Sequence, residues 1–221
     1  MSLIFNQSIE CANTALSKLR SSGTETPITH SKNFLSVDYT LESDRYRRAH
    51  LSIVDARDSR KVWMMHCTVF PYVDDPSPIF GFDIIAGPSR ASGAFQDFSN
   101  GGRSDHPMML WFAERSNLHS WKKDRNLPDW AERIFSPSMI AIGSVGSDEL
   151  SQFISIGLEN LDYYLKHVGS TRTAGTDYSD VQNFYCTNQS LNPHTPQFMM
   201  SLGLSKEDAD SFMKNVLFPL I

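Results

Sequence analysis

The chain has 221 residues, of which 40% are hydrophobic and 20% are charged, a composition typical of a folded protein that buries its own core. The 25 acidic residues outnumber the 20 basic ones, and the formal net charge of −5 argues against a dedicated nucleic-acid-binding protein. The three cysteines are widely spaced, which argues against a disulfide framework or a cysteine-rich zinc module and indicates a reducing compartment.

Nothing in the sequence indicates a membrane or secretory protein. No apolar run approaches the roughly 20 residues that a membrane span needs, and the first residues lack the basic region of a signal peptide. The sequence also lacks internal repeats and long linkers. We therefore expect a cytoplasmic monomer with one domain over residues 1–221.

The first half of the chain predicts one helix and then several strands. Apolar residues at helical spacing over 3–20 predict an amphipathic helix. Loose alternation predicts strands at 34–41 and 48–54. The segments 62–70 and 79–86 are apolar on both faces, which indicates central strands.

The second half predicts two further strands and then helices. The strands are expected at 108–113 and 138–142. A helix capped by Ser147 is expected to end near His167, followed by helices at 177–190 and from the capping box at Ser205 to about Leu217. Strands in the middle with helices at both ends predict an α+β fold, in which helices cover an antiparallel sheet.

Two polar residues interrupt the apolar central strands, His66 and Asp83. The segment 71–78 between the strands is rich in turn-forming residues, so the strands are expected to pair as neighbours. A hairpin symmetric about positions 74 and 75 places His66 directly opposite Asp83. A slip of one residue would move one of them to the other face.

A buried aspartate is costly unless it is protonated or paired. Opposite a histidine, it forms a coupled proton donor and acceptor. The same pair is also explained as a structural hydrogen bond that fixes sheet register, and the residues leave both interpretations open. His50 lies on the preceding strand and is expected to approach His66, with a one-residue ambiguity in its face.

Other motifs are absent from the sequence. The histidines and cysteines lack metal-ligand spacing, so no metal site is expected. The chain also lacks the glycine-rich loops that bind nucleotides or flavins. If the His66–Asp83 pair takes part in redox chemistry, the electrons must come from outside the protein.

Several segments in the same order resemble the ferredoxin-dependent bilin reductases, and most closely the phycocyanobilin:ferredoxin oxidoreductase branch. They are His66–Pro71, Pro78–Gly87, Asp83–Ser92, Arg125–Trp130 with Ile134–Ser136, Tyr185–Cys186 with Asn192, and Val216–Phe218. The resemblance covers roughly residue 45 to the end of the chain.

The resemblance implies a three-layer α/β/α sandwich that binds biliverdin IXα between the sheet and the C-terminal helices. It implies a radical mechanism with no bound cofactor, in which a reduced [2Fe-2S] ferredoxin supplies the electrons. Asp83 and His66 take the positions of the catalytic proton donors. The substrate-binding positions are His50, Ser52, Ser92, Arg125, Trp130, Tyr185, Asn192 and His194, with Arg125 and Ser92 expected at a propionate.

Two positions depart from the family pattern. Phycocyanobilin-forming members carry His-Leu-Glu where this chain has His50-Leu51-Ser52, and a lysine that contacts a propionate is replaced within Asn192-Pro193-His194. Without the glutamate, the D-ring vinyl group is expected to survive. The resemblance then implies a four-electron reduction to phycoerythrobilin through 15,16-dihydrobiliverdin. The alternatives are phycocyanobilin, a two-electron stop at the dihydro intermediate, or a non-catalytic bilin- or haem-binding protein.

Ferredoxins are strongly acidic, so the resemblance also implies a basic docking face. The candidate residues are Arg45, Arg47, Arg48, Arg103, Lys122 and Lys123.

Overall fold

An antiparallel sheet forms the middle layer of the molecule. In the computed structural model, which describes residues 2–27 and 36–221, seven strands follow one another in chain order and each pairs with the next. They are β1 (Thr24–Thr26), β2 (Ser36–Glu42), β3 (Tyr46–Ala56), β4 (Val62–Pro71), β5 (Ile79–Ala86), β6 (Ala91–Ser99) and β7 (Ile140–Val145).

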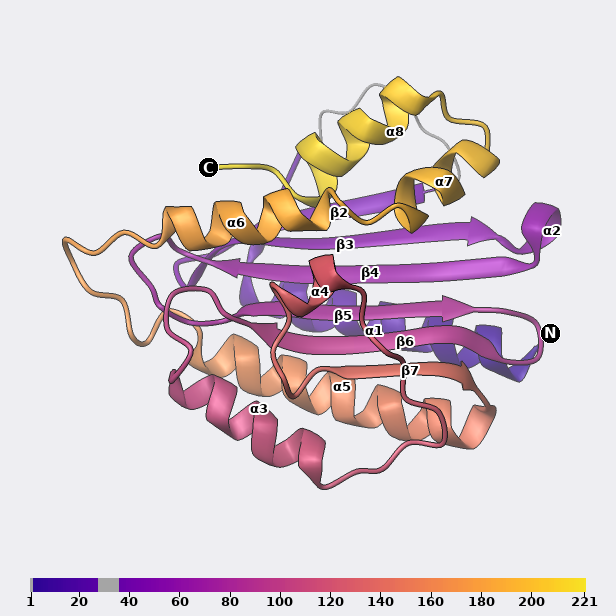
Figure 1. The fold of residues 1–221 in the computed structure, drawn as a ribbon, viewed down its shortest axis with the longest axis horizontal. Helices are drawn as coiled ribbons and strands as arrows, with labels where there is room; N and C mark the ends of the chain where they lie inside the picture. The colour runs from indigo at the N-terminus through magenta and orange to yellow at the C-terminus, as the bar shows by residue number, and fades with distance from the viewer. Residues whose placement is uncertain (1, 28–35) are drawn as a thin grey trace.

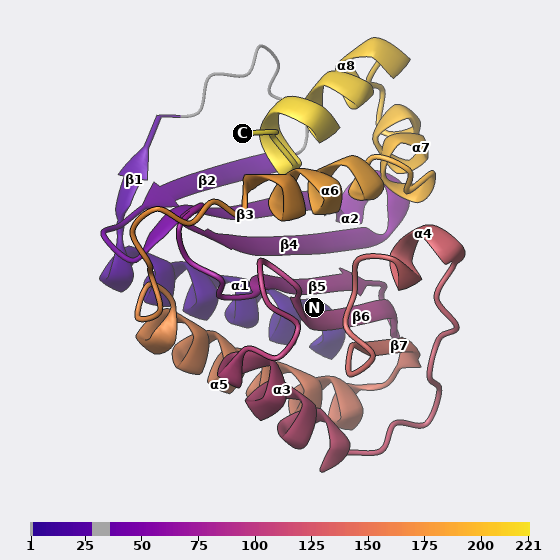
Figure 2. The ribbon, with the colours of Figure 1, turned by 60° about the vertical axis from the view of Figure 1, so that its left-hand side comes forward.

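Helices cover both faces of this sheet (Figures 1 and 2). One face packs against α1 (Leu3–Ser22), α3 (Pro107–Asn117) and α5 (Ser147–His167). The other is covered by α4 (Asp129–Glu132), α6 (Ser179–Gln189), α7 (His194–Ser201), α8 (Lys206–Phe212) and the π-helical turn η1 (Met213–Leu217), while the short α2 (Arg57–Arg60) joins β3 to β4. The α+β fold and its three-layer α/β/α sandwich are therefore confirmed.

Alternating residues of the central strands supply two separate hydrophobic cores. Trp63, Met65 and Cys67 of β4 are buried in the larger core, beneath α1 and α5. The opposite face carries a smaller core, in which Phe70 of β4 packs with the side chains of the C-terminal helices. The even-numbered residues of β4, including His66, therefore lie between the sheet and the C-terminal layer.

The close approach of α5 to β5 depends on Gly157. A Cβ atom at this position would lie 2.4 Å from the ring of Phe82, which is far inside van der Waals contact. The backbone carbonyl of Gly157 accepts a hydrogen bond from the buried side chain of Gln96 on β6, at 3.2 Å. The absent side chain thus lets the helix pack directly on the sheet.

The prediction of a strand at 108–113 is wrong, because this segment lies within helix α3. His106 caps the helix by accepting a hydrogen bond from the backbone N–H of Met108, and Pro107 occupies its first turn, where proline is favoured. Met108 and Phe112 are buried four residues apart. A six-residue apolar run is too short for its periodicity to separate a strand from a helix, so the capping residues were the better signal.

Other boundaries moved by a few residues. The strand expected at 34–41 is β2 from Ser36, and its first two positions lie outside the described residues. The strand expected at 138–142 is β7, and β6 was not anticipated at all. Ser147 is the first residue of α5 rather than its cap, which is Gly146, whereas Ser205 caps α8 as expected by accepting from the N–H of Asp208.

Over the residues that the structure describes, no helix combines the length and apolar character needed to cross a lipid bilayer.

Candidate active site

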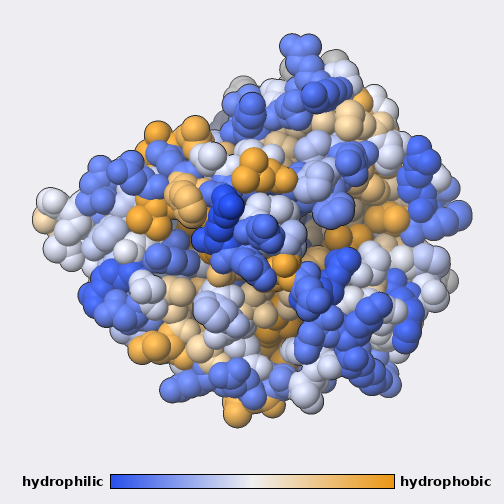
Figure 3. All heavy atoms as spheres, in the orientation of Figure 1, coloured by the Kyte–Doolittle hydropathy of each residue, from blue (hydrophilic) through white to orange (hydrophobic). Residues whose placement is uncertain are grey.

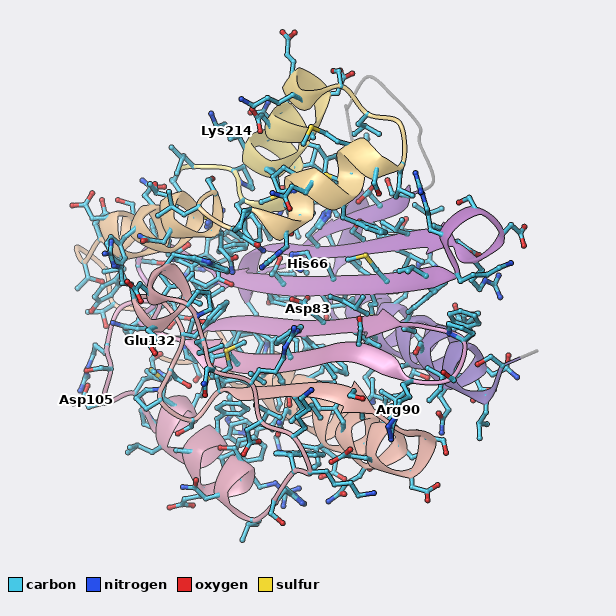
Figure 4. All side chains as sticks on the ribbon, turned by 45° about the vertical axis from the view of Figure 1, so that its right-hand side comes forward. His66, Asp83, Arg90, Asp105, Glu132 and Lys214 are labelled. Atoms are coloured by element: carbon cyan, nitrogen blue, oxygen red, sulfur yellow. The ribbon has the colours of Figure 1, made fainter. Side chains whose placement is uncertain are left out.

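The expected pair of His66 and Asp83 is formed at the centre of the sheet. The two residues stand opposite each other on β4 and β5, and His66 Nδ1 lies 2.7 Å from Asp83 Oδ1. Figure 4 shows both at mid-sheet, beneath the C-terminal helices. The side chains retain 19% and 36% exposure, so the pair is partly shielded yet open to a ligand. A hydrogen bond this short holds a proton between imidazole and carboxyl group.

The other ring nitrogen of His66 is available for a further contact. Among the described residues, Nε2 of His66 is buried and has no hydrogen-bond partner. The ring of Phe218 packs edge-on against His66 with 5.4 Å between centroids, and Tyr185 packs edge-on against Phe218. A buried ring nitrogen without a hydrogen-bond partner is costly. A hydrogen bond between this nitrogen and a substrate atom therefore stabilises the complex.

The cross-strand register extends this pair into a row of residues. Ser52 on β3 stands opposite His66, and Asp38 on β2 stands opposite Ser52. In the other direction, Phe95 on β6 stands opposite Asp83. Residues opposite one another in antiparallel strands face the same side, so all five side chains lie on the face beneath the C-terminal layer.

Asp38 was not anticipated from the sequence. Its side chain is only 2% exposed, and its carboxylate accepts a hydrogen bond from Ser36 Oγ at 2.8 Å and another from Ser52. Burial pushes the pKa of Asp38 upward, but hydrogen bonds from His50, Ser52 and Ser36 outweigh it and hold the pKa below its usual value. The alternation within β2 could have indicated which face of the sheet Asp38 occupies. Nothing in the sequence indicated the register of β2 against β3.

His50 lies beside the row rather than within it. It stands opposite Thr68 on β4, is completely buried, and places Nε2 3.4 Å from Asp38 Oδ1. Its Nδ1 lies 3.3 Å from Arg48 Nη2 and 3.2 Å from Thr40 Oγ1. Burial lowers the pKa of His50 to about 4 although Asp38 opposes this, so His50 is neutral at physiological pH.

Arg125 places a positive charge near the same face. Its backbone N–H donates to the carbonyl of Ala141 on β7 at 2.8 Å, and its guanidinium lies 5.4 Å from the ring centroid of Phe95. Cβ atoms at Gly93 and Gly143 would come within 3.0 and 3.3 Å of the Arg125 side chain. Because these two glycines carry no side chain, the exposed side chain of Arg125 can lie directly over them.

A cavity of about 770 Å³ adjoins Arg125 at the β7 edge, lined in part by Trp121, Phe135, Ser136 and Ala141. Figure 3 shows the face on which the C-terminal helices and α4 lie, where apolar atoms are visible in a hollow between polar rims. A guanidinium beside such a cavity suits an anionic group such as a carboxylate.

Asp97 anchors the segment that borders this cavity. Its carboxylate accepts hydrogen bonds from the backbone N–H of Ser136 at 2.9 Å, from the Ser136 hydroxyl, and from Ser99 Oγ at 2.6 Å. Burial raises the pKa of Asp97 to about 6 despite these hydrogen bonds. Asp97 was not singled out from the sequence, where it stands in a strand that was not anticipated.

The remaining expected site residues are spread over the same side of the molecule. Tyr185 on α6 is buried, and its hydroxyl accepts from Gln189 Nε2 at 2.8 Å. Trp130 on α4 is partly buried and packs against Phe135. Ser92 is exposed in a bulge at the start of β6, where its hydroxyl donates to the carbonyl of Ile85.

Asn192 lies just before α7, and His194 is the first residue of that helix. The side-chain oxygen of Asn192 accepts from the backbone N–H of His194 at 3.0 Å, and its amide donates to Thr195 Oγ1. These local hydrogen bonds fix the turn that begins α7. His194 itself is exposed at the start of that helix.

Two of the six expected docking residues are not available to a partner. Arg47 and Arg48 are wrong for this role, because both guanidinium groups are engaged inside the protein. Arg47 donates to Gln182 and lies over the ring of Phe70, while Arg48 contacts His50 and the carbonyl of Val216. Burial lowers the pKa of both groups, to about 10 for Arg48. Arg45, Arg103, Lys122 and Lys123 are exposed.

No group of three or more potential metal ligands occurs within residues 2–27 and 36–221. The three cysteines are buried and free. The expectation that no cofactor is bound remains a prediction.

The covered sheet face, its histidine–aspartate pair and the nearby guanidinium define a site that can exchange protons with an anionic ligand. The chain belongs to the ferredoxin-dependent bilin reductase family, whose model, described as "Ferredoxin-dependent bilin reductase", matches residues 14–219. This confirms the resemblance drawn from the sequence segments.

Named relatives support the assignment. The chain is 32% identical to a phycocyanobilin:ferredoxin oxidoreductase of Prochlorococcus marinus (strain MIT 9313), over 78% of this chain and 66% of that protein. The solved structure of PcyX is 28% identical, with a TM-score of 0.68, over 96% of this chain and 98% of that one. Tomato phytochromobilin synthase, solved with biliverdin, shares the fold at 16% identity and a TM-score of 0.63, over 93% and 80% of the two chains.

Proposed function

We propose that the protein reduces biliverdin IXα with electrons from a reduced [2Fe-2S] ferredoxin, and that Asp83 and His66 supply protons. The observation that carries this proposal is the 2.7 Å contact between His66 Nδ1 and Asp83 Oδ1 on the covered face of the sheet. Each two-electron reduction of a carbon–carbon double bond consumes two protons. A coupled acid–base pair beside the substrate meets that need.

Within this proposal, the tetrapyrrole lies flat between the sheet and the C-terminal layer. Its pyrrole nitrogens and lactam oxygens face Asp83 and the unpartnered Nε2 of His66, while a propionate reaches the guanidinium of Arg125. Ser92 is the second propionate contact, Trp130 and Tyr185 line the pocket, and His50, Ser52, Asn192 and His194 complete it.

The product we propose is phycoerythrobilin, formed by a four-electron reduction through 15,16-dihydrobiliverdin and bilin radical intermediates. Four electrons and four protons enter the substrate, at the C15–C16 bridge and at the A ring. Protonation of the D-ring vinyl group requires an acid next to it, and the hydroxyl of Ser52 is too weak an acid for this step at neutral pH. Asp55, three residues further, is exposed and paired with Arg57.

One observation favours the alternative product, phycocyanobilin: the similar protein from Prochlorococcus marinus is a phycocyanobilin:ferredoxin oxidoreductase. A non-catalytic bilin-binding protein is the alternative of another class. The acid–base pair on the covered face of the sheet argues against it, because a mere binding site has no need of a partly buried carboxyl group, which is costly to desolvate.

An anaerobic assay tests the proposal. The protein is mixed with one equivalent of biliverdin and a reduced ferredoxin, absorbance spectra are followed over time, and the products are separated against bilin standards. We expect ferredoxin-dependent consumption of biliverdin and phycoerythrobilin as the main product. Binding without reduction would support the non-catalytic alternative, and phycocyanobilin as the main product would show that the Ser52 argument is wrong.

We propose that the chain acts as a cytoplasmic monomer with one domain. Size-exclusion chromatography with light scattering checks the oligomeric state, and a dimer would contradict it.

A further inference from the structure

Asp38 is a buried carboxylate in the same cross-strand row as the proposed proton donors. The row runs from Asp38 through Ser52 and His66 to Asp83 over four neighbouring strands. The missing glutamate is at position 52, and the structure places an acid one strand further out, in hydrogen-bond contact with Ser52. This juxtaposition cannot be read from either strand alone.

The contacts of Asp38 keep its carboxylate ionised and hold it in position. Ser36, Ser52 and His50 surround the carboxylate, and only 2% of the side chain is exposed. Arg48 can donate to Nδ1 of His50, which leaves the Nε2 hydrogen of the neutral imidazole directed at Asp38. A carboxylate that accepts several hydrogen bonds stays ionised at neutral pH, so Asp38 is a fixed negative charge rather than a proton donor.

One neighbouring cation, Arg48, opposes the charge of Asp38, but replacing Asp38 still removes the whole of its own contribution. Arg48, the cation of the cluster, reaches the far side of His50, with Nη2 3.3 Å from His50 Nδ1, so the imidazole lies between its charge and Asp38. Asp38 stands two strands from His66, about 10 Å away. Beyond these, the titratable groups near Asp38 are His50 beside the row and His66 and Asp83 within it, while Glu42 and Cys186 interact with Arg48.

We propose that Asp38 is a further functional residue of the substrate site, whose buried negative charge stabilises the protonated form of the bound bilin. This inference rests on the proposed function, because it requires a bilin along the row. The step is a proton transfer alone. A pyrrole nitrogen gains an N–H bond, the proton comes from the His66–Asp83 pair, and that pair regains a proton from solvent. The protonated bilin carries a positive charge and accepts an electron more readily.

The size of the effect follows from Coulomb's law. One unit charge about 10 Å away, at an effective dielectric constant of roughly 20 to 40, shifts a proton equilibrium by about 0.5 to 1 pKa unit. Above its pKa, the protonated fraction of the bilin would therefore fall about three- to tenfold when the charge is removed.

The test is a spectroscopic pH titration of bound biliverdin in the absence of ferredoxin, since protonation changes the visible absorption of a bilin. The neutral variants are Asp38→Asn, which preserves shape, and Asp38→Thr, which suits a strand. Glu42→Gln is the matched control, because it removes an equal charge from an exposed position on the same strand. Circular dichroism and thermal melting establish that each variant is folded.

We expect the apparent pKa of the bound bilin to fall by about 0.5 to 1 unit in the neutral variants and to stay unchanged in Glu42→Gln. An unchanged value in a folded neutral variant that binds biliverdin overturns the inference. If neither variant folds, the wild-type protein decides. The bound bilin should have a higher pKa than free biliverdin in the same buffer, and an equal or lower value overturns the inference.

A different result would refute the proposed function itself: no reduction of the bound bilin when reduced ferredoxin is added to the wild-type complex. A complex that is reduced normally but shows no Asp38-dependent shift refutes only the role of Asp38. A wild-type protein that does not bind biliverdin refutes both.

Discussion

The hydrogen bond between His66 and Asp83 makes the carboxyl group of Asp83 a sensitive position for substitution. Asp83→Asn nearly preserves shape but cannot release a proton, so we expect turnover to fall by about a hundredfold or more while biliverdin binding is retained. Turnover with reduced ferredoxin and binding by absorbance titration measure the two effects. His66→Gln should behave in the same way. Wild-type turnover in Asp83→Asn would remove the central role of the pair, and loss of folding would instead indicate a structural one.

Ser52 offers a second test at a single residue. Ser52→Glu places a carboxylic acid opposite His66, and we expect the variant to form D-ring-reduced product, which chromatography against phycocyanobilin detects. Ser52→Gln is the matched control, since it has the same length but no acidic proton, and it should leave the product as in the wild type. An unchanged product in Ser52→Glu would mean that further pocket residues set the outcome.

Among the elements, α5 depends most clearly on one small residue. Gly157→Ala adds a methyl group that would meet the ring of Phe82 at 2.4 Å. Alanine in a helix interior usually gains about 1 kcal/mol over glycine, but overpacking costs about 1 to 3 kcal/mol, so we expect net destabilisation. Urea denaturation followed by circular dichroism measures it. Ser155→Ala on the exposed side of α5 is the control and should not destabilise, whereas a stabilised Gly157→Ala protein would show that the contact relaxes freely.

The elements also show what the sequence could predict. The pairing of β4 with β5 was predicted, because two apolar runs flank one short turn and each carries a single polar residue. The symmetric hairpin has the observed register, although the sequence left a slip of one residue open. Helix α3 was misread, because its apolar run is too short for periodicity to decide. Asp38 was missed for another reason. Its distance from His66 depends on the β2–β3 and β3–β4 registers at once. The β3–β4 register carried a one-residue ambiguity, and the β2–β3 register was not inferred.

Two buried groups give the whole molecule opposing responses to pH. His50, whose pKa is lowered from 6.5 to about 4, contributes stability above pH 6.5 that is lost as pH falls towards 4. Asp97, whose pKa is raised from 3.8 to about 6, contributes stability at low pH that is lost as pH rises through about 6. Between pH 4 and 6 the two contributions partly cancel, so the free energy of unfolding of the wild-type protein changes little with pH.

Asp97→Asn should expose the contribution of His50. We expect the free energy of unfolding of this variant to rise more steeply than that of the wild type between pH 4 and 6.5, by on the order of 2 to 3 kcal/mol. Urea denaturation at a series of pH values measures this change in the free energy of unfolding. In His50→Gln, the free energy of unfolding should instead fall relative to that of the wild type as the pH rises over the same range. Parallel profiles for the wild type and Asp97→Asn would show that Asp97 does not titrate as described, and parallel profiles for the wild type and His50→Gln would show the same for His50.

The chain-ordered pairing of the strands has a consequence for how the protein folds. Each strand pairs with the next one along the chain, so the ladders from β2 to β6 close from local hairpins, whereas the β6–β7 ladder has to wait for a segment about 40 residues further on. His66 and Asp83 are only 17 residues apart and belong to one such hairpin. The chemistry proposed for the mature protein thus depends on a contact of short range that can form early. Arg125 and the C-terminal layer, encoded later in the chain, can then assemble over this pair.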